Sequence, residues 1–170
     1  NQVHGPKGAG RVSSEAFDKV SRARPKQLSH RAVVVPTQGR WGGSGDHVGL
    51  LAVDDAAVWE NAHHIWAMSE ANVARLAATA RDHLVLLIGL QSGKAFRHGV
   101  GLVVGVWSIS HAEFEGWKFD KHGNKRPGFQ FIAGRPNSAV HSARTRYLGH
   151  RLLDSTGKII QPQVGVRYFL

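Results

Sequence analysis

The chain has 170 residues, 42% of them hydrophobic, with a net charge of +10 and no cysteine. This size fits a single globular domain with a modest extension. The missing cysteines exclude disulfides, thiol catalysis and cysteine-ligated zinc, and they favour an intracellular location, cytoplasmic or nucleoid/nuclear. No apolar run reaches the roughly 18 residues that a membrane-spanning helix needs, so no membrane partner is predicted.

The positive charge is concentrated towards the two ends of the chain. Residues 1–31 carry a net +5, residues 32–116 a net −3, and residues 117–170 a net +8. A basic flank beside a folded core is typical of proteins that bind a polyanion, although a solvated basic surface is the plain alternative. We therefore expect a basic amino-terminal arm over 1–31, one folded domain over 32–170, and nucleic acid, DNA or RNA, as the partner.

The amino-terminal part of the chain alternates short strands and helices. Ser13 or Ser14 caps a short helix that Pro25 ends, unless this segment is a disordered tail. Trp41 lies next to Arg40 in a glycine-rich loop, where it either stacks on a base or simply lies on the surface. The expected elements that follow the arm are a strand at 32–35, the loop at 37–46, a strand at 48–53 and a helix at 56–62.

The middle of the chain has the clearest periodicity. Ser69 is a helix cap, and four apolar residues after it share one helix face: Val73, Leu76, Ala77 and Ala80. Two apolar segments, 84–90 and 99–109, are predicted to be the central strands, the first buried on both faces. Gly101 and Gly105 share one face of the second, where they permit close approach by a backbone or a ring.

A polar loop is predicted at 111–128, where aromatic residues are interleaved with Lys and Arg. Such a pattern suits stacking on bases and neutralising phosphates. The alternative is that Phe114 and Phe119 fold the loop back onto the core. A strand at 129–133, a basic segment at 135–151, a hairpin at 151–160 and a last strand at 164–170 complete the domain.

Two histidine-containing clusters are candidates for metal or catalytic sites. His63 and His64 are adjacent, without an HxxxH spacing or a carboxylate at a matching spacing, so no metal ligands are predicted. His111, Glu113 and Glu115 form the densest polar cluster, but no nucleophile motif accompanies it. We therefore predict no catalytic residues and no cofactor, and expect a protein that is not an enzyme.

The order of these elements resembles that of YTH domains and the related EVE domains. The resemblance covers about residues 33–137. It rests on Ile65-Trp66-Ala67-Met68-Ser69 before a helix, the two central strands, Trp117 in the polar loop, and Phe129-Gln130-Phe131-Ile132 in the strand after it. It implies a PUA-like fold, that is, a curved, mostly antiparallel β-barrel with short flanking helices. It also implies that an aromatic cage binds a modified base of a nucleic acid, for example a methylated base.

The resemblance further implies which residues read the base. Trp66 and Trp117 would be cage walls in one pocket, and Ala67, Met68 and Ser69 would supply backbone groups to the base edge. Trp41, Trp59 and Phe114 are all candidates for a third wall. The residues expected to contact the nucleic-acid backbone are Arg40, Lys94, Arg97, Lys118, Lys121, Lys125, Arg126, Arg144 and Arg146.

The sequence thus predicts an α+β nucleic-acid-binding module that reads a modified base. The targeting domain of a larger modification-dependent restriction or RNA-processing system is one role that fits this prediction. Two alternatives stay open. One is a coat or other structural protein, viral or otherwise, that holds RNA with its basic arm. The other is a metal-dependent nuclease, which would need converging carboxylates.

Overall fold

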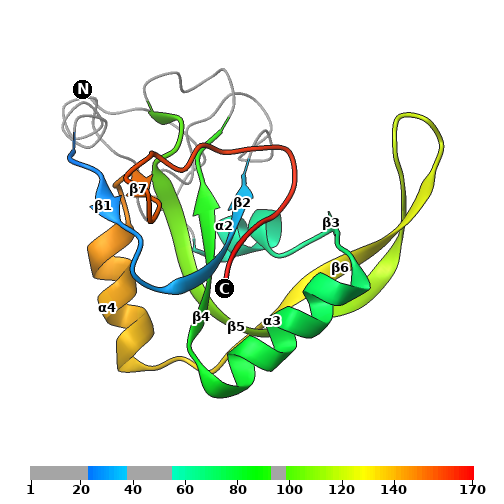
Figure 1. Ribbon diagram of the computed structural model, residues 1–170, viewed down its shortest axis with the longest axis horizontal. Helices are drawn as coiled ribbons and strands as arrows, with labels where there is room; N and C mark the ends of the chain where they lie inside the picture. Colours follow the sequence, from blue (N-terminus) through cyan, green and yellow to red (C-terminus); the bar gives the residue numbers. More distant parts are fainter. Residues whose placement is uncertain (1–22, 38–54, 93–98) are drawn as a thin grey trace.

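The structure, a computed structural model, describes residues 23–37, 55–92 and 99–170. Six strands form one sheet in the order β3-β6-β5-β4-β2-β8, and β1 pairs with β7 in a separate two-stranded sheet. Figure 1 shows the large sheet curling into a half-barrel with a few short helices around it. The expectation of a mixed α/β domain built on a curved sheet is therefore confirmed. In chain order the elements are β1 (Lys26–Gln27), β2 (Arg31–Pro36), α2 (Asp55–Ala62), β3 (Trp66–Ala67), α3 (Glu70–Asp82), β4 (Val85–Leu90), β5 (Val103–Phe119), β6 (Lys125–Ala133), α4 (Ser138–Tyr147), β7 (Leu152–Leu153) and β8 (Arg167–Phe169).

β4 is the most deeply buried strand. Each of its residues is buried, as the continuous apolar run predicted. It pairs in parallel with β2 and antiparallel with β5, whereas the other pairings in the large sheet are antiparallel. The predictions that 84–90 and 99–109 hold the central strands, and that the sheet is mostly antiparallel, are both confirmed, although β5 begins only at Val103.

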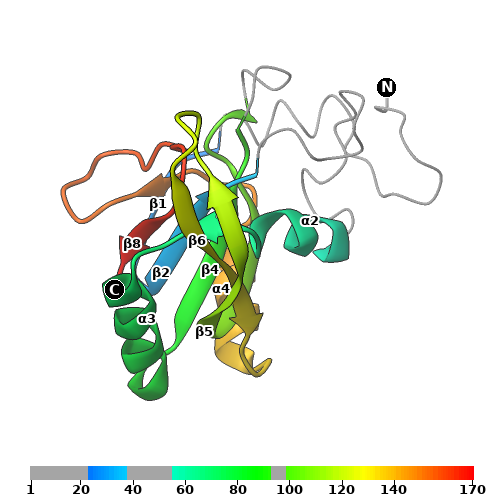
Figure 2. The same ribbon diagram turned by 90° about the vertical axis from the view of Figure 1, so that its right-hand side faces the viewer.

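Hydrophobic clusters cover both faces of this sheet centre. Ala32 and Val34 of β2 face one cluster, which includes Tyr147 from α4, and Val33 faces the other. The second cluster includes Leu76 from α3, and Ala62 and Met68 also pack there. Figure 2 shows α3 and α4 as separate helices around the sheet. None of the helices in the described residues combines the length and apolar character needed to cross a membrane.

The helix predictions in this part of the chain are confirmed. Ser69 caps α3, and its Oγ accepts a hydrogen bond from the backbone N–H of Asn72 at 3.1 Å. α2 agrees with the expected 56–62 to within one residue. The expected close approach at Gly105 is also present. A Cβ at this position would lie 2.1 Å from the ring of Trp107, so the ring occupies the space that the glycine leaves.

The prediction of a long polar loop at 111–128 is wrong. β5 continues to Phe119 and β6 begins at Lys125, so these residues form a β-hairpin with a short turn. The two strands pair continuously, apart from bulges near Ser110 and Glu115. The outer half of this strand is mostly exposed. It therefore has polar side chains in place of the apolar run by which a buried strand is recognised in a sequence.

The ends of the described chain join the folded body. β1 pairs with β7, and Arg31 begins β2, so residues 26–31 belong to the folded body rather than to a separate arm. Leu153 bridges Ile159 in the antiparallel sense, which confirms the expected hairpin at 151–160. β8 confirms a strand within 164–170. The helix expected after Ser13 and the strand expected at 48–53 fall on residues outside those described, except for the end of that helix.

Candidate nucleic-acid interface

A β-hairpin arm, residues 111–133, carries the largest group of predicted site residues. Asp120 builds its turn. Its Oδ1 accepts hydrogen bonds from the backbone N–H groups of His122 (2.8 Å) and Asn124 (2.9 Å), and Gly123 adopts a positive φ of 79°. The bond from Asn124 is the main reason why the pKa of Asp120 lies below its ordinary value. Asp120 therefore holds the turn while charged, and the turn presents cations to solvent.

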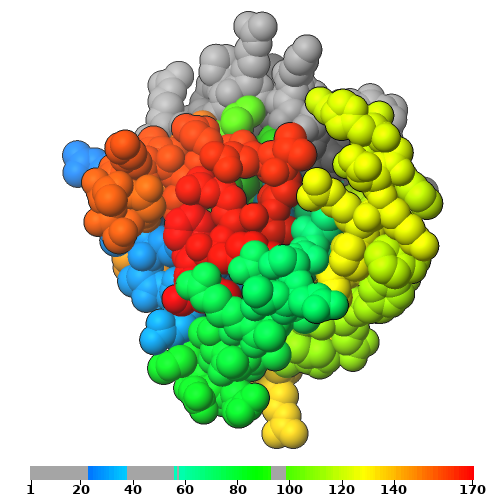
Figure 3. Space-filling model, turned by 45° about the vertical axis from the view of Figure 1, so that its right-hand side comes forward, coloured from blue at the N-terminus to red at the C-terminus, as the bar shows by residue number. Residues whose placement is uncertain are grey.

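An apolar groove of about 570 Å³ lies between this hairpin arm and α3. The hairpin side consists of Phe114, Trp117, Pro127 and Phe129. Glu70, Val73, Ala74 and Ala77 form the helix side. In Figure 3, α3 and the hairpin arm lie on the same face of the molecule, with the carboxy-terminal segment beside them. The volume is in the range of sites that hold small organic ligands, so the groove has room for a nucleobase, which is smaller.

Among the described residues that line this groove, Phe114 and Trp117 are the exposed aromatic ones, whereas Phe129 is buried. Their ring centroids are 5.4 Å apart with an interplanar angle of 69°, and each residue is 53% exposed. Residues three apart on a regular strand point to opposite faces. Here a bulge between Phe114 and Gly116 adds one residue, Glu115, so that both rings reach the same face. Local irregularity of the strand thus creates the aromatic pair.

Trp66 is not among the described residues that line this groove. Its indole Nε1 donates a hydrogen bond to the carbonyl of Ala62 at 2.8 Å, and its ring packs against the cluster on the α3 side of the sheet. β3 places Trp66 opposite Phe129 in the sheet register. The structure therefore brings Phe114, not Trp66, next to Trp117.

The residues expected to approach the base edge have mostly structural contacts. Ala67 is exposed and pairs with Gly128 in the sheet. The side chain of Met68 is buried in the core, and the hydroxyl of Ser69 caps α3. Trp59 stacks on His63 (centroids 4.8 Å apart) and packs edge-on against Trp107, away from the lining of the groove. Trp41 lies outside the described residues.

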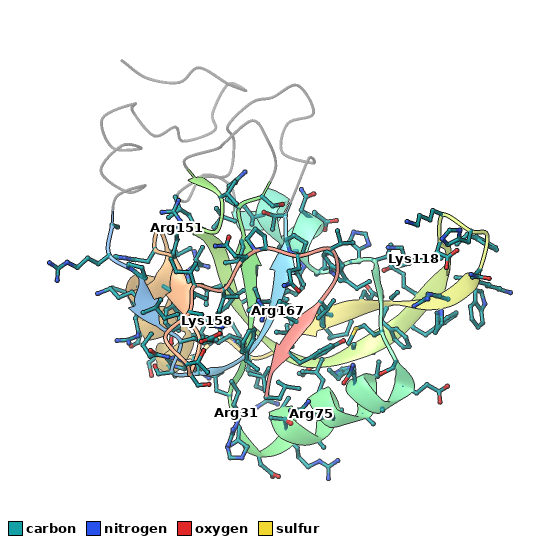
Figure 4. The ribbon with its side chains drawn as sticks, turned by 45° about the horizontal axis from the view of Figure 1, so that its top comes forward. Arg31, Arg75, Lys118, Arg151, Lys158 and Arg167 are labelled. Atoms are coloured by element: carbon teal, nitrogen blue, oxygen red, sulfur yellow. The ribbon has the colours of Figure 1, made fainter. Side chains whose placement is uncertain are left out.

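The predicted phosphate-binding cations divide into two groups. Lys121, Lys125 and Arg126 lie on the exposed end of the hairpin arm, and the Nζ of Lys125 is 4.4 Å from the ring centroid of Trp117. Lys118 lies on the same arm, but its ammonium donates to the carbonyl of Ile65 at 3.0 Å and so holds β3 against the hairpin. Figure 4 shows Lys118 on the hairpin side and Lys158 and Arg151 on the opposite side.

The remaining cations are elsewhere. Arg144 and Arg146 are on α4, where they donate to the carbonyls of Val106 and Gln27, and Figure 1 places α4 across the sheet from the hairpin. They do not share a surface with the groove. Arg40, Lys94 and Arg97 lie outside the described residues.

Sequence reasoning missed two sets of residues. Pro127 and the helix side of the groove carried no signal, because Val73 and Ala77 have the same spacing as core residues of any amphipathic helix. A second set, Glu60, His63 and His64, was recognisable from its spacing in the sequence. They are spaced i, i+3, i+4 and converge at the end of α2, with one ligand atom from each within 4.8 Å of the others. The statement that no carboxylate has a matching spacing is therefore wrong.

Comparisons with protein-family models, with curated proteins and with solved structures gave no significant match to this chain.

Proposed function

We propose that the protein is a nucleic-acid-binding module that takes one unstacked base into the groove between α3 and the hairpin arm. The observation that carries this proposal is the pair of half-exposed rings, Phe114 and Trp117, at an apolar groove beside a cationic turn. Aromatic rings with exposed faces provide stacking surfaces, and nearby Lys and Arg neutralise the phosphates of the same strand.

The lining of the groove suits the face of a base better than a phosphate. Among the described lining residues only Glu70 is charged. Its carboxylate would repel a phosphate but can accept a hydrogen bond from an amino or imino group on a base edge. The cations stand outside the lining, on the turn and beside Trp117. This separation is typical of nucleic-acid-binding proteins, in which phosphate contacts position the strand and base contacts recognise the identity of the base.

Preference for a modified base is the finer part of the proposal. A methyl group that enters the apolar groove gains about 0.8 kcal/mol from burial. A base can reach a groove of this kind only from a single strand or after flipping out of a duplex. The protein should therefore bind single-stranded or locally opened nucleic acid better than an intact duplex.

A binding screen tests this function. Fluorescence anisotropy is measured for the purified protein against matched single- and double-stranded oligonucleotides, with and without base methylation. Trp117→Ala and Phe114→Ala should each weaken binding by ~1–3 kcal/mol, or roughly 5- to 150-fold. No binding at low salt would contradict the proposal.

A matched control is available on the same strand. Phe119 is 69% exposed and is not among the described residues of the groove, so Phe119→Ala should leave the affinity unchanged. Ala74→Leu fills the groove from an exposed helix position and should weaken binding without unfolding the helix. Equal losses in Phe119→Ala and Trp117→Ala would place binding outside the groove.

The two alternatives predict different measurements. A coat protein would assemble into large particles, which light scattering detects. A metal-dependent nuclease would cleave the oligonucleotides of the screen when a divalent ion is added.

A further inference from the structure

The carboxyl end of α2 carries a group of side chains that the proposed function does not use. Glu60 lies in the last turn of the helix, and His63 and His64 follow it directly. One ligand atom from each of the three lies within 4.8 Å of the others. Among the residues that the structure describes, no other three His, Asp or Glu side chains converge in this way.

Hydrogen bonds hold both imidazole rings in a defined orientation. The Nδ1 of His63 is 2.8 Å from the carbonyl oxygen of Trp59, which can only accept, so this nitrogen carries the hydrogen. The Nδ1 of His64 is 2.8 Å from a carboxylate oxygen of Glu115 on the hairpin arm and donates in the same way. A neutral ring that donates from Nδ1 has its lone pair on Nε2. Histidines that bind metals in proteins are oriented by such bonds to a carbonyl or a carboxylate.

The remaining geometry suits a small ion. The Nε2 of His64 is 3.6 Å from Oε2 of Glu60. Two ligand atoms of a tetrahedral zinc ion are separated by a similar distance, about 3.4 Å, when both bonds are about 2.1 Å long. The side chain of Glu60 is 68% exposed and can adjust its position, whereas His63 is stacked on Trp59. The side chain of His64 is 32% exposed, so the site opens to solvent.

We infer that Glu60, His63 and His64 bind one divalent transition-metal ion, best represented by Zn²⁺, with Glu115 and the Trp59 carbonyl as orienting groups. Two imidazole nitrogens and a carboxylate suit zinc and its first-row neighbours, whereas Ca²⁺ and Mg²⁺ prefer oxygen ligands. Three protein ligands leave a fourth position for water. The ion would tie the end of α2 to the hairpin arm through the bond between His64 and Glu115. This site does not depend on nucleic-acid binding.

Titration with Zn²⁺ alone, followed by calorimetry on the full chain, tests the site. We expect one ion whose binding is lost or strongly weakened in Glu60→Gln and His64→Gln. Glu115→Gln removes only an orienting group and should weaken binding by ~10–100-fold. Co²⁺ in place of Zn²⁺ should give visible absorption bands that disappear in the same variants. At 100 times the dissociation constant, Zn²⁺ should raise the midpoint of thermal unfolding by roughly 5–10 °C.

The control is a second His–Glu pair on the hairpin arm. His111 Nε2 and Glu113 Oε1 are 3.0 Å apart, and within the described part of the chain they belong to no such group of three. His111→Gln should therefore leave Zn²⁺ binding unchanged. Because Glu60 is on the surface, Glu60→Gln should fold normally, which circular dichroism verifies. Undiminished Zn²⁺ binding in Glu60→Gln and His64→Gln, or no binding by the unaltered protein, would overturn the inference.

Discussion

β5 passes through two regions with opposite surroundings. From Val103 to Ile109 it lies in the sheet centre, where it pairs with β4 and most of its residues are buried. From Glu113 to Phe119 it forms the hairpin arm with β6, and most of its residues are exposed. Both halves carry large apolar side chains, but core packing accounts only for those of the inner half. In the outer half, Phe114 and Trp117 stay half-exposed and line the groove, which is why we propose that these two rings bind a ligand.

The hairpin arm is nevertheless anchored to the body. A two-stranded ribbon is marginal by itself in water. Here Lys118 holds the carbonyl of Ile65, and the side chain of Ile65 lies over Gly128, where a Cβ would approach it to 2.7 Å. The two regions therefore differ in how far their side chains are buried. The arm is held to the body, but its rings stay accessible to solvent.

Truncating side chains should give the largest difference in the free energy of unfolding between the sheet centre and the hairpin arm. Leu87 of β4 is fully buried, so Leu87→Ala should lower the free energy of unfolding by ~2–5 kcal/mol through lost burial and a cavity. Phe119→Ala at the arm should change it by less than about 0.5 kcal/mol. Urea denaturation measures both. Comparable losses in the two variants would mean that the arm is part of the cooperative core.

Glycine substitutions should distinguish crowding from backbone strain. Gly105→Ala places a Cβ against the Trp107 ring and should cost ~1–3 kcal/mol of stability. Gly123→Ala meets no atom within 4 Å, but the residue has a positive φ, so its cost should be about 1 kcal/mol. Thermal unfolding compares the two. A neutral Gly105→Ala would show that the ring moves aside freely.

The salt dependence of nucleic-acid binding should change when a cation on the hairpin arm is removed, and not when one on the opposite side of the molecule is removed. Lys121→Gln should lower the slope of log affinity against log salt by about 0.7–0.9, because one phosphate contact is lost. Lys158 is also exposed but lies on the opposite side, so Lys158→Gln is the matched control and should leave the slope unchanged. If only Lys158→Gln reduced the slope, the phosphates would have to be bound on the side of Lys158 and not at the hairpin arm.

The smallest expected effect is a pH dependence in the sheet body. Burial, aided by the charge of Arg146, lowers the pKa of His30 below its ordinary 6.5, and its ring contacts the Tyr147 hydroxyl at 2.6 Å. The unfolded chain thus binds the proton more readily than the folded one. The contribution of neutral His30 to the free energy of unfolding is therefore complete above pH 6.5 and is lost as the pH falls through the lowered pKa. Thermal unfolding between pH 7.5 and 5 should show a weaker pH dependence in His30→Gln. An unchanged dependence would exclude His30 as a contributor.

Local patterns in the sequence alone determined much of the body. The apolar run of β4 predicted a central strand because a segment without polar residues must be buried on both faces. Ser69 and the apolar spacing after it predicted α3, because caps and helical periodicity are local properties. The interleaved aromatic and basic residues located the candidate site to the segment that became the hairpin arm.

Only the tertiary structure decided which side chains meet. The bulge at Glu115 turns Phe114 and Trp117 to one face, and a single inserted residue reverses every side-chain direction beyond it. Trp66 instead turns towards Ala62 and the core. The bond between His64 and Glu115 joins residues 51 positions apart. Such pairings depend on how β3 and the hairpin arm pack together, and no local periodicity encodes that arrangement.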